Sequence, residues 1–150
     1  MHAIILAAGQ GKRLAEFNPE GLPKCLLEFG GRSLLERQLE ILFEQGICHA
    51  TLVVGYKAGL IVDYVGTLAV RPEVAFVYNP AFDKGSVLSL LAAHEILNAG
   101  KDVLVLDADV LFHADIMRSL VDSEHPNCYL IDRDFVPGDE PVKIALHNGR

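Results

Sequence analysis

The sequence predicts an α/β domain in which helices cover both faces of a mostly parallel β-sheet. Short, wholly apolar runs such as residues 3–8 recur along the chain, which is typical of strands buried on both faces. These runs alternate with segments of helical periodicity, and that alternation indicates right-handed βαβ units. The chain has 150 residues, of which 51% are hydrophobic, so it can bury one sizeable core.

The expected elements alternate from one end of the chain to the other. Strands are predicted at residues 3–8, 51–54, 74–78, 103–106, 128–131 and 142–146. The first helix begins at Ser33, because Glu36 three residues later completes a capping box, and Gly46 ends it. Further helices are predicted at 58–68, 86–98 and 113–122. The residues expected to face inward are Leu35, Leu39, Leu42 and Phe43 in the first helix, Val87, Leu90, Leu91 and Leu97 in the third, and Ile116, Met117, Leu120 and Val121 in the fourth.

The charge balance argues against a nucleic-acid partner and favours a small anionic ligand. The chain carries 13 basic and 20 acidic residues, a net charge of -7, which argues against a nucleic-acid polymer. Residues 1–37 hold five basic and four acidic side chains (+1), which leaves -8 for the rest and favours a small anionic ligand near the start.

No apolar stretch approaches the roughly 18 residues that a membrane span needs. Three cysteines without paired spacing favour a reducing compartment, so we expect a cytoplasmic protein, with homo-oligomerisation left open.

A glycine-rich loop follows the first predicted strand. The sequence AAGQGKRL has Leu14 where a dinucleotide fingerprint needs glycine, and Arg13 where a P-loop needs Ser or Thr. Its small residues allow a backbone to approach a ligand closely, and successive N–H groups can surround an anion. Arg13 adds a planar set of donors that matches phosphate oxygens. The loop therefore indicates phosphate binding, with a solvated glycine turn as the alternative.

Two further motifs contain charged side chains that are expected at the same edge of the predicted sheet as the glycine-rich loop. Pro23 stiffens the chain before Lys24, and the strand at 103–106 runs into Asp107 and Asp109, which share one face if the strand continues. Two carboxylates after an apolar strand suggest Mg²⁺ or Mn²⁺ held largely through substrate phosphates, against the alternative of a solvated turn. Ligands of parallel α/β sheets bind beyond the carboxyl ends of the strands, where both unusual loops lie.

These motifs occur together in the order found in a known superfamily. ILAAGQGKRL, PKCLLEFGGRSLLERQLEIL, LVVGYK and the DAD after the fourth strand resemble the nucleotidyltransferases that join an NTP to a phosphorylated sugar or alcohol. NPAFDKGSVLSLLAAHEIL and LIDRDFVPGDEPVK are most similar to bacterial phosphocholine-type cytidylyltransferases. The resemblance covers essentially the whole chain. It implies a Rossmann-like, three-layer α/β/α nucleotidyltransferase fold with a mostly parallel central sheet.

The resemblance also implies roles for individual residues. The expected nucleotide-binding residues are Leu6, Ala7, Ala8, Gly9, Gly11, Lys12 and Ser86, of which Ser86 would face a pyrimidine base. Ser86 is also a simple candidate for a helix N-cap. Arg13 would stabilise the leaving pyrophosphate and Lys24 the α-phosphate. Asp109 matches the metal-binding aspartate of the superfamily, and Asp107, where many relatives have a non-acidic residue, is the second expected ligand.

The implied activity is Mg²⁺-dependent (or Mn²⁺-dependent) transfer of CMP from CTP to a small phosphorylated alcohol such as phosphocholine, with release of pyrophosphate. Alternatives are a sugar-1-phosphate nucleotidyltransferase that uses UTP, dTTP or GTP, a glycosyltransferase, and a non-catalytic nucleotide-binding regulatory domain. Residues 1–150 are expected to form one nucleotidyltransferase domain that lacks its C-terminal part, because Asn148-Gly149 predicts a hairpin without a return strand. The alternative is that a partner fills this edge of the sheet. The second metal carboxylate of the superfamily would also lie beyond residue 150.

Overall fold

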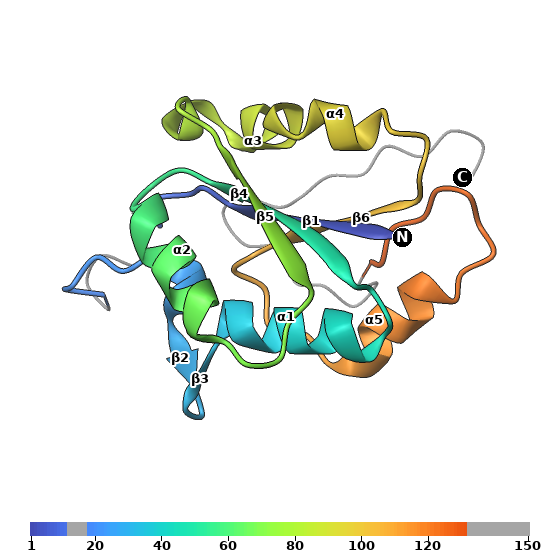
Figure 1. The fold of residues 1–150 in the computed structure, drawn as a ribbon, viewed down its shortest axis with the longest axis horizontal. Helices are drawn as coiled ribbons and strands as arrows, with labels where there is room; N and C mark the ends of the chain where they lie inside the picture. Colours follow the sequence, from blue (N-terminus) through green and yellow to red (C-terminus); the bar gives the residue numbers. More distant parts are fainter. Residues whose placement is uncertain (12–17, 132–150) are drawn as a thin grey trace.

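The structure is a computed structural model that describes residues 1–11 and 18–131 (Figure 1). Within these residues the central sheet has four parallel strands in the order β5–β4–β1–β6, namely β1 (His2–Ala7), β4 (His49–Val54), β5 (Glu73–Tyr78) and β6 (Val103–Asp107). Helices α1 (Leu34–Glu44), α2 (Ala58–Thr67) and α5 (Ala114–Val121) lie on one side of the sheet. Helices α3 (Ser86–Ala92) and α4 (His94–Leu97) lie on the other side. The predicted three-layer α/β/α fold is confirmed.

The central strand β1 explains why its sequence is an unbroken apolar run. Successive side chains of a strand point to opposite faces of the sheet, and here both faces are covered. Ile5 packs into the core beneath α1 and α2, whereas Ile4 packs against Val53 and Ala93 on the side of α3 and α4. Both isoleucines are completely buried.

The order of the strands places one edge of the sheet at a topological switch point. The chain moves outward from β1 to β4 and β5, and then crosses back to β6 on the other side of β1. In the register of these pairs Leu6 lies beside Val53 in β4 and beside Asp107 in β6. Ligands of open α/β sheets bind beyond the strand ends where the order reverses. That point here lies between the loops that follow β1 and β6.

A short hairpin precedes α1 and was not predicted. It joins β2 (Glu28–Phe29) to β3 (Arg32–Ser33) in an antiparallel pair. The connecting residues Gly30 and Gly31 have φ angles of 60° and 75°, a conformation that glycine adopts without strain. Ser33 then caps α1 as predicted, because its hydroxyl accepts a hydrogen bond from the Glu36 backbone N–H at 3.0 Å.

The predicted helix over residues 86–98 is divided in two at Ala93, and its inward face differs from the prediction. Val87 and Leu91 are 75% and 59% exposed, whereas Ser89 and Ala93 are buried. These two small side chains occupy the face toward the sheet, and Ile96 packs beside Ala93, whereas Leu97, predicted to face inward, is exposed. In the other helices, Phe43 and Ile116 are also exposed although predicted inward, while Leu35, Leu39, Leu42 and Met117 are buried as predicted.

The predicted strand at 128–131 is wrong. None of the described strands pairs with this segment, and Tyr129 is 82% exposed. An apolar run forms a strand only where its N–H and C=O groups find a neighbouring strand, and the sequence of the run does not contain that information. The strand predicted at 142–146 lies outside the described residues. Among the described helices, none has the length and apolar character needed to cross a membrane.

Candidate active site

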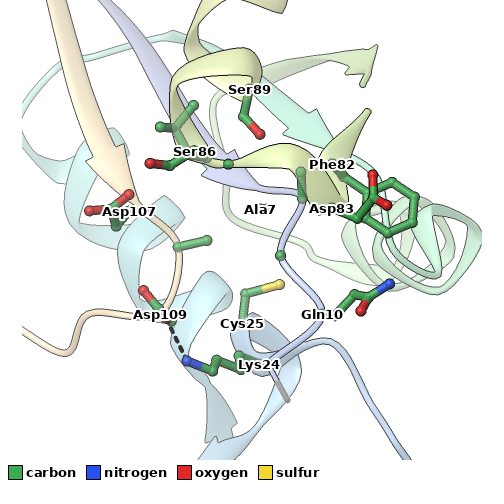
Figure 2. Close-up of a pocket in the computed structure, with 16 residues that line it drawn as sticks. Ala7, Gln10, Lys24, Cys25, Phe82, Asp83, Ser86, Ser89, Asp107 and Asp109 are labelled. Carbon is green, nitrogen blue, oxygen red and sulfur yellow. Dashed lines mark hydrogen bonds and ion pairs between the residues drawn. The ribbon is translucent and has the colours of Figure 1, made fainter. Parts of the chain in front are cut away.

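A cavity of about 440 Å³ opens where the sheet order reverses (Figure 2). The loop after β1 and the turn after β6 form part of its wall, and the start of α3 forms another part. The cavity brings together most of the residues predicted for the site: Leu6, Ala7, Ala8, Gly9, Gly11, Lys24, Ser86, Asp107 and Asp109 all line it. The predicted Lys12 and Arg13 lie outside the described residues.

The loop after β1 is held at its start and lies against Lys24 at its end. The Ala8 carbonyl accepts a hydrogen bond from the Tyr56 backbone N–H at 3.1 Å, and Ala8 itself is buried. Gly11 has a φ of +64°, and a Cβ atom there would lie 2.6 Å from Cγ of Lys24. Glycine is therefore favoured at position 11 both by the backbone conformation and by the closeness of the lysine side chain.

Lys24 and Asp109 form an ion pair across the cavity rim. Lys24 begins the 3₁₀ helix η2 (Lys24–Leu26), and its Nζ donates to Oδ2 of Asp109 at 3.1 Å (Figure 2). The two side chains are 23% and 44% exposed, respectively. A pair this exposed contributes about 0–1 kcal/mol to stability. Both groups therefore stay accessible to a ligand, and the fold depends little on their contact.

Asp107 and Asp109 place two carboxylates on the same side of the cavity (Figure 2). Partial desolvation, and secondarily the negative charge of Asp109, raises the pKa of Asp107 above its ordinary value. Carboxylate oxygens are the donors that Mg²⁺ prefers, and it commonly binds one or two of them together with phosphate oxygens and water. Within the described residues no group of three or more His, Cys, Asp or Glu could hold a metal. The carboxylates of Asp107 and Asp109 therefore fit a Mg²⁺ or Mn²⁺ ion that also binds phosphate oxygens and water.

The wall on the α3 side presents two serine hydroxyls (Figure 2). Ser86 is exposed and is the first residue of α3, whereas Gly85, with a φ of 114°, occupies the cap position. The predicted N-cap role of Ser86 is therefore wrong. Ser89 is buried, and its Oγ accepts a hydrogen bond from Nδ2 of Asn79 at 3.0 Å. The orientation of the Asn79 amide follows from its Oδ1, which accepts from the Ala81 backbone N–H.

Residues 3–142 match the MobA-like NTP transferase domain. The chain belongs to this family. The choline-phosphate cytidylyltransferase of Streptococcus pneumoniae is 36% identical over 79% of this chain and 51% of its own length. The enzyme of the same name from Haemophilus influenzae is 30% identical over 100% of this chain and 60% of its own. The inositol-1-phosphate CTP transferase structure from T. maritima matches with a TM-score of 0.69 and 28% identity, covering 83% of this chain and 49% of that one.

These comparisons confirm the resemblance to the nucleotidyltransferase superfamily. They include other cytidylyltransferases, among them the CTP:phosphoglutamine cytidylyltransferase of Campylobacter jejuni, which is 24% identical over 90% of this chain. The NTP transferase chain spans only part of the length of its curated relatives, for example 54%, 22% and 51% of three of them.

Several residues that line the cavity of this NTP transferase domain were not predicted. They are Cys25, Asp83, Ser89 and Ala108. Cys25 is buried, and burial raises the pKa of its thiol to about 12, so the thiol stays protonated and unreactive at neutral pH. Phe82 packs so closely on Gly55 that a Cβ atom at position 55 would lie 2.5 Å from Cβ of Phe82. For the wall on the α3 side the sequence held two signals, the resemblance at Ser86 and a polar residue within the periodicity of a helix at Ser89.

Proposed function

We propose that this NTP transferase domain transfers CMP from CTP to a small phosphorylated alcohol, with phosphocholine as the leading acceptor, and releases pyrophosphate. The observation that carries the proposal is the meeting of Lys24 with Asp109, 85 residues later in the chain, on the rim of a cavity lined by the glycine loop. The names of the relatives support cytidylyl transfer to a phosphorylated acceptor.

The proposed reaction needs no catalytic base. A phosphate monoester has a second pKa near ~6, so at neutral pH the acceptor is already largely a dianionic nucleophile. One of its oxygens attacks the α-phosphorus of CTP in line, an O–P bond forms, and the bond from the α-phosphorus to the bridging oxygen breaks. Pyrophosphate leaves with the electron pair of that bond. The protein has to supply orientation and positive charge around the transferring phosphoryl group.

Lys24 is the described cation best placed for that role. Its ammonium would leave Asp109 for an oxygen of the α-phosphate, and Arg13 would contact the leaving pyrophosphate. Asp109 and Asp107 would hold Mg²⁺ or Mn²⁺. When bound, such an ion would neutralise negative charge on the triphosphate.

The hydroxyls of Ser86 and Ser89 favour the binding of a nucleobase that carries a carbonyl oxygen. Because Asn79 donates to Oγ of Ser89, the hydroxyl proton of Ser89 is free to point elsewhere, and Ser89 lines the cavity. Ser86 offers a second hydroxyl at the exposed end of the same wall. The cytosine ring has a carbonyl oxygen that can accept such a hydrogen bond, whereas the adenine ring has none. We therefore assign Ser86 and Ser89 to recognition of the base.

The proposal is tested by incubating the protein with Mg²⁺, each NTP and a panel of phosphorylated acceptors while pyrophosphate is monitored. Release that requires CTP and phosphocholine or a similar amino-alcohol phosphate supports it. Release with UTP, dTTP or GTP and a sugar 1-phosphate would contradict the choice of substrates and favour the sugar nucleotidyltransferase. Nucleotide binding without release for any pair would contradict the transferase and favour a regulatory domain.

We expect Gly11→Ala to lower turnover about 10²-fold. The new Cβ would lie 2.6 Å from Cγ of Lys24, so the lysine or the loop has to move, and a displacement of about 1 Å in a catalytic site can cost that much. The measurement is the steady-state rate of pyrophosphate release. Gly46→Ala is the matched control, because Gly46 also has a positive φ (76°), but a Cβ atom at that position would meet no other atom within 4 Å. Equal rates in the two variants would contradict the role of the contact between Gly11 and Lys24.

A further inference from the structure

Gln38 is a buried polar residue on the apolar face of α1. It is 2% exposed and lies on the same helical stripe as Leu35, Leu39 and Leu42, which are completely buried. Its Nε2 donates two hydrogen bonds, to the carbonyl oxygen of Asp107 at 3.0 Å and to that of Val110 at 2.8 Å. Its Oε1 is buried without a hydrogen-bond partner among the described residues. Both N–H donors of the side chain thus form hydrogen bonds to the backbone of one short turn.

The two carbonyls lie on either side of Ala108 and Asp109. One amide group therefore ties together the start and the end of the turn that carries the Asp109 carboxylate. The Ala108 backbone N–H donates to the Leu6 carbonyl at 3.1 Å, which fixes the same turn to β1. The turn is held by α1 on one side and by the central strand on the other, while the Asp109 side chain itself is exposed.

A general role in packing does not account for glutamine at this position. A methionine has nearly the same length and could fill a similar space among the leucines without burying polar atoms. A buried carbonyl oxygen without a partner is costly, and here Oε1 of Gln38 is such an atom. What glutamine provides in return is a pair of N–H donors aimed at the backbone on both sides of Asp109.

We propose that Gln38 is a positioning residue that holds the 107–110 turn so that Asp107 and Asp109 face the cavity. The inference rests on the proposed function, in which these carboxylates hold the metal. Gln38 does not line the cavity and would act through the backbone of the turn. Its loss should loosen the turn first and should weaken metal binding as a consequence, because the carboxylates would no longer be held in one arrangement.

The test compares Gln38→Met with Leu42→Val, a core change on the same helix that does not involve these hydrogen bonds. Two measurements are made without turnover: Mn²⁺ binding by electron paramagnetic resonance with a non-hydrolysable CTP analogue, and amide hydrogen exchange of residues 108–111. We expect Gln38→Met to bind Mn²⁺ about 10-fold more weakly. We also expect it to speed exchange at Ala108, whose N–H is bonded to Leu6, more than exchange in β1 or β4.

Unchanged Mn²⁺ affinity in Gln38→Met would overturn the inference. An equal loss of affinity in Leu42→Val, at an equal fall in melting temperature, would also overturn it, because that result would indicate a general effect of stability. Should Gln38→Met not fold, Gln38→Glu keeps the length and a polar end but offers no N–H, and the same outcomes are expected. The wild-type assay for pyrophosphate tests the proposed reaction separately, since neither binding nor exchange requires turnover.

Discussion

Replacing Lys24 with methionine is expected to lower nucleotidyl transfer about 10²–10³-fold and to leave the fold intact. The size of the loss follows from the removal of one preorganised donor at a centre where negative charge gathers. The fold should persist because the ion pair of Lys24 with Asp109 is partly exposed and contributes about 0–1 kcal/mol. For a domain of this size such a change shifts the melting temperature by roughly 4 °C or less.

The rate is measured as pyrophosphate release at saturating CTP, and the melting temperature of the same sample reports the fold. Lys57→Met is the matched control. Lys57 also donates through Nζ, to the Glu20 carbonyl at 3.0 Å, but it does not line the cavity. The control should keep its rate. A Lys24→Met protein with a near-normal rate would mean that the lysine is a structural partner of Asp109 and that the phosphoryl group is stabilised by other residues.

The strands of the sheet were predictable because each one corresponds to an apolar run in the sequence. Four apolar runs correspond to β1, β4, β5 and β6. A strand with both faces covered has to be apolar throughout, which explains the runs in β1 and β4, whereas most residues of β5 are exposed. The third long helix was predicted with the wrong face inward. The prediction placed the apolar Val87 and Leu91 inward, whereas the structure places the small Ser89 and Ala93 toward the sheet. Helical periodicity does not indicate which residues are small enough for close packing.

The position of the candidate site was predictable, but its supporting contacts were not. Loops at the carboxyl ends of neighbouring parallel strands have to meet, so Lys24, Asp109 and the glycine loop could be placed together before the structure was known. The role of Gln38 had one signal, a polar residue within the stripe of Leu35, Leu39 and Leu42. Its partners are backbone carbonyls 69 and 72 residues later in the chain. Every residue has a backbone carbonyl, so the sequence does not indicate which ones a glutamine contacts.

Asp109→Asn is expected to lower turnover by about 10²–10³-fold as well, and to weaken Mn²⁺ binding by about 10-fold or more. Asparagine keeps the shape of the side chain but removes its charge, so the variant tests the carboxylate rather than the packing of the turn. It also removes one of the causes that raise the pKa of Asp107, so that pKa should fall toward its ordinary value, with burial still acting on it. Carboxyl ¹³C chemical shifts measured against pH report this change.

The double variant of Lys24→Met and Asp109→Asn distinguishes the proposed chemistry from a structural ion pair. In the proposed reaction the two side chains separate, the lysine to the α-phosphate and the aspartate to the metal, so each loss acts on a different group. The two effects should then nearly multiply, to about 10⁴-fold or more. If the only role of each side chain were to hold the other, the double variant would be no slower than either single one. That result would contradict both assignments, because the 3.1 Å contact would then be the whole of their function.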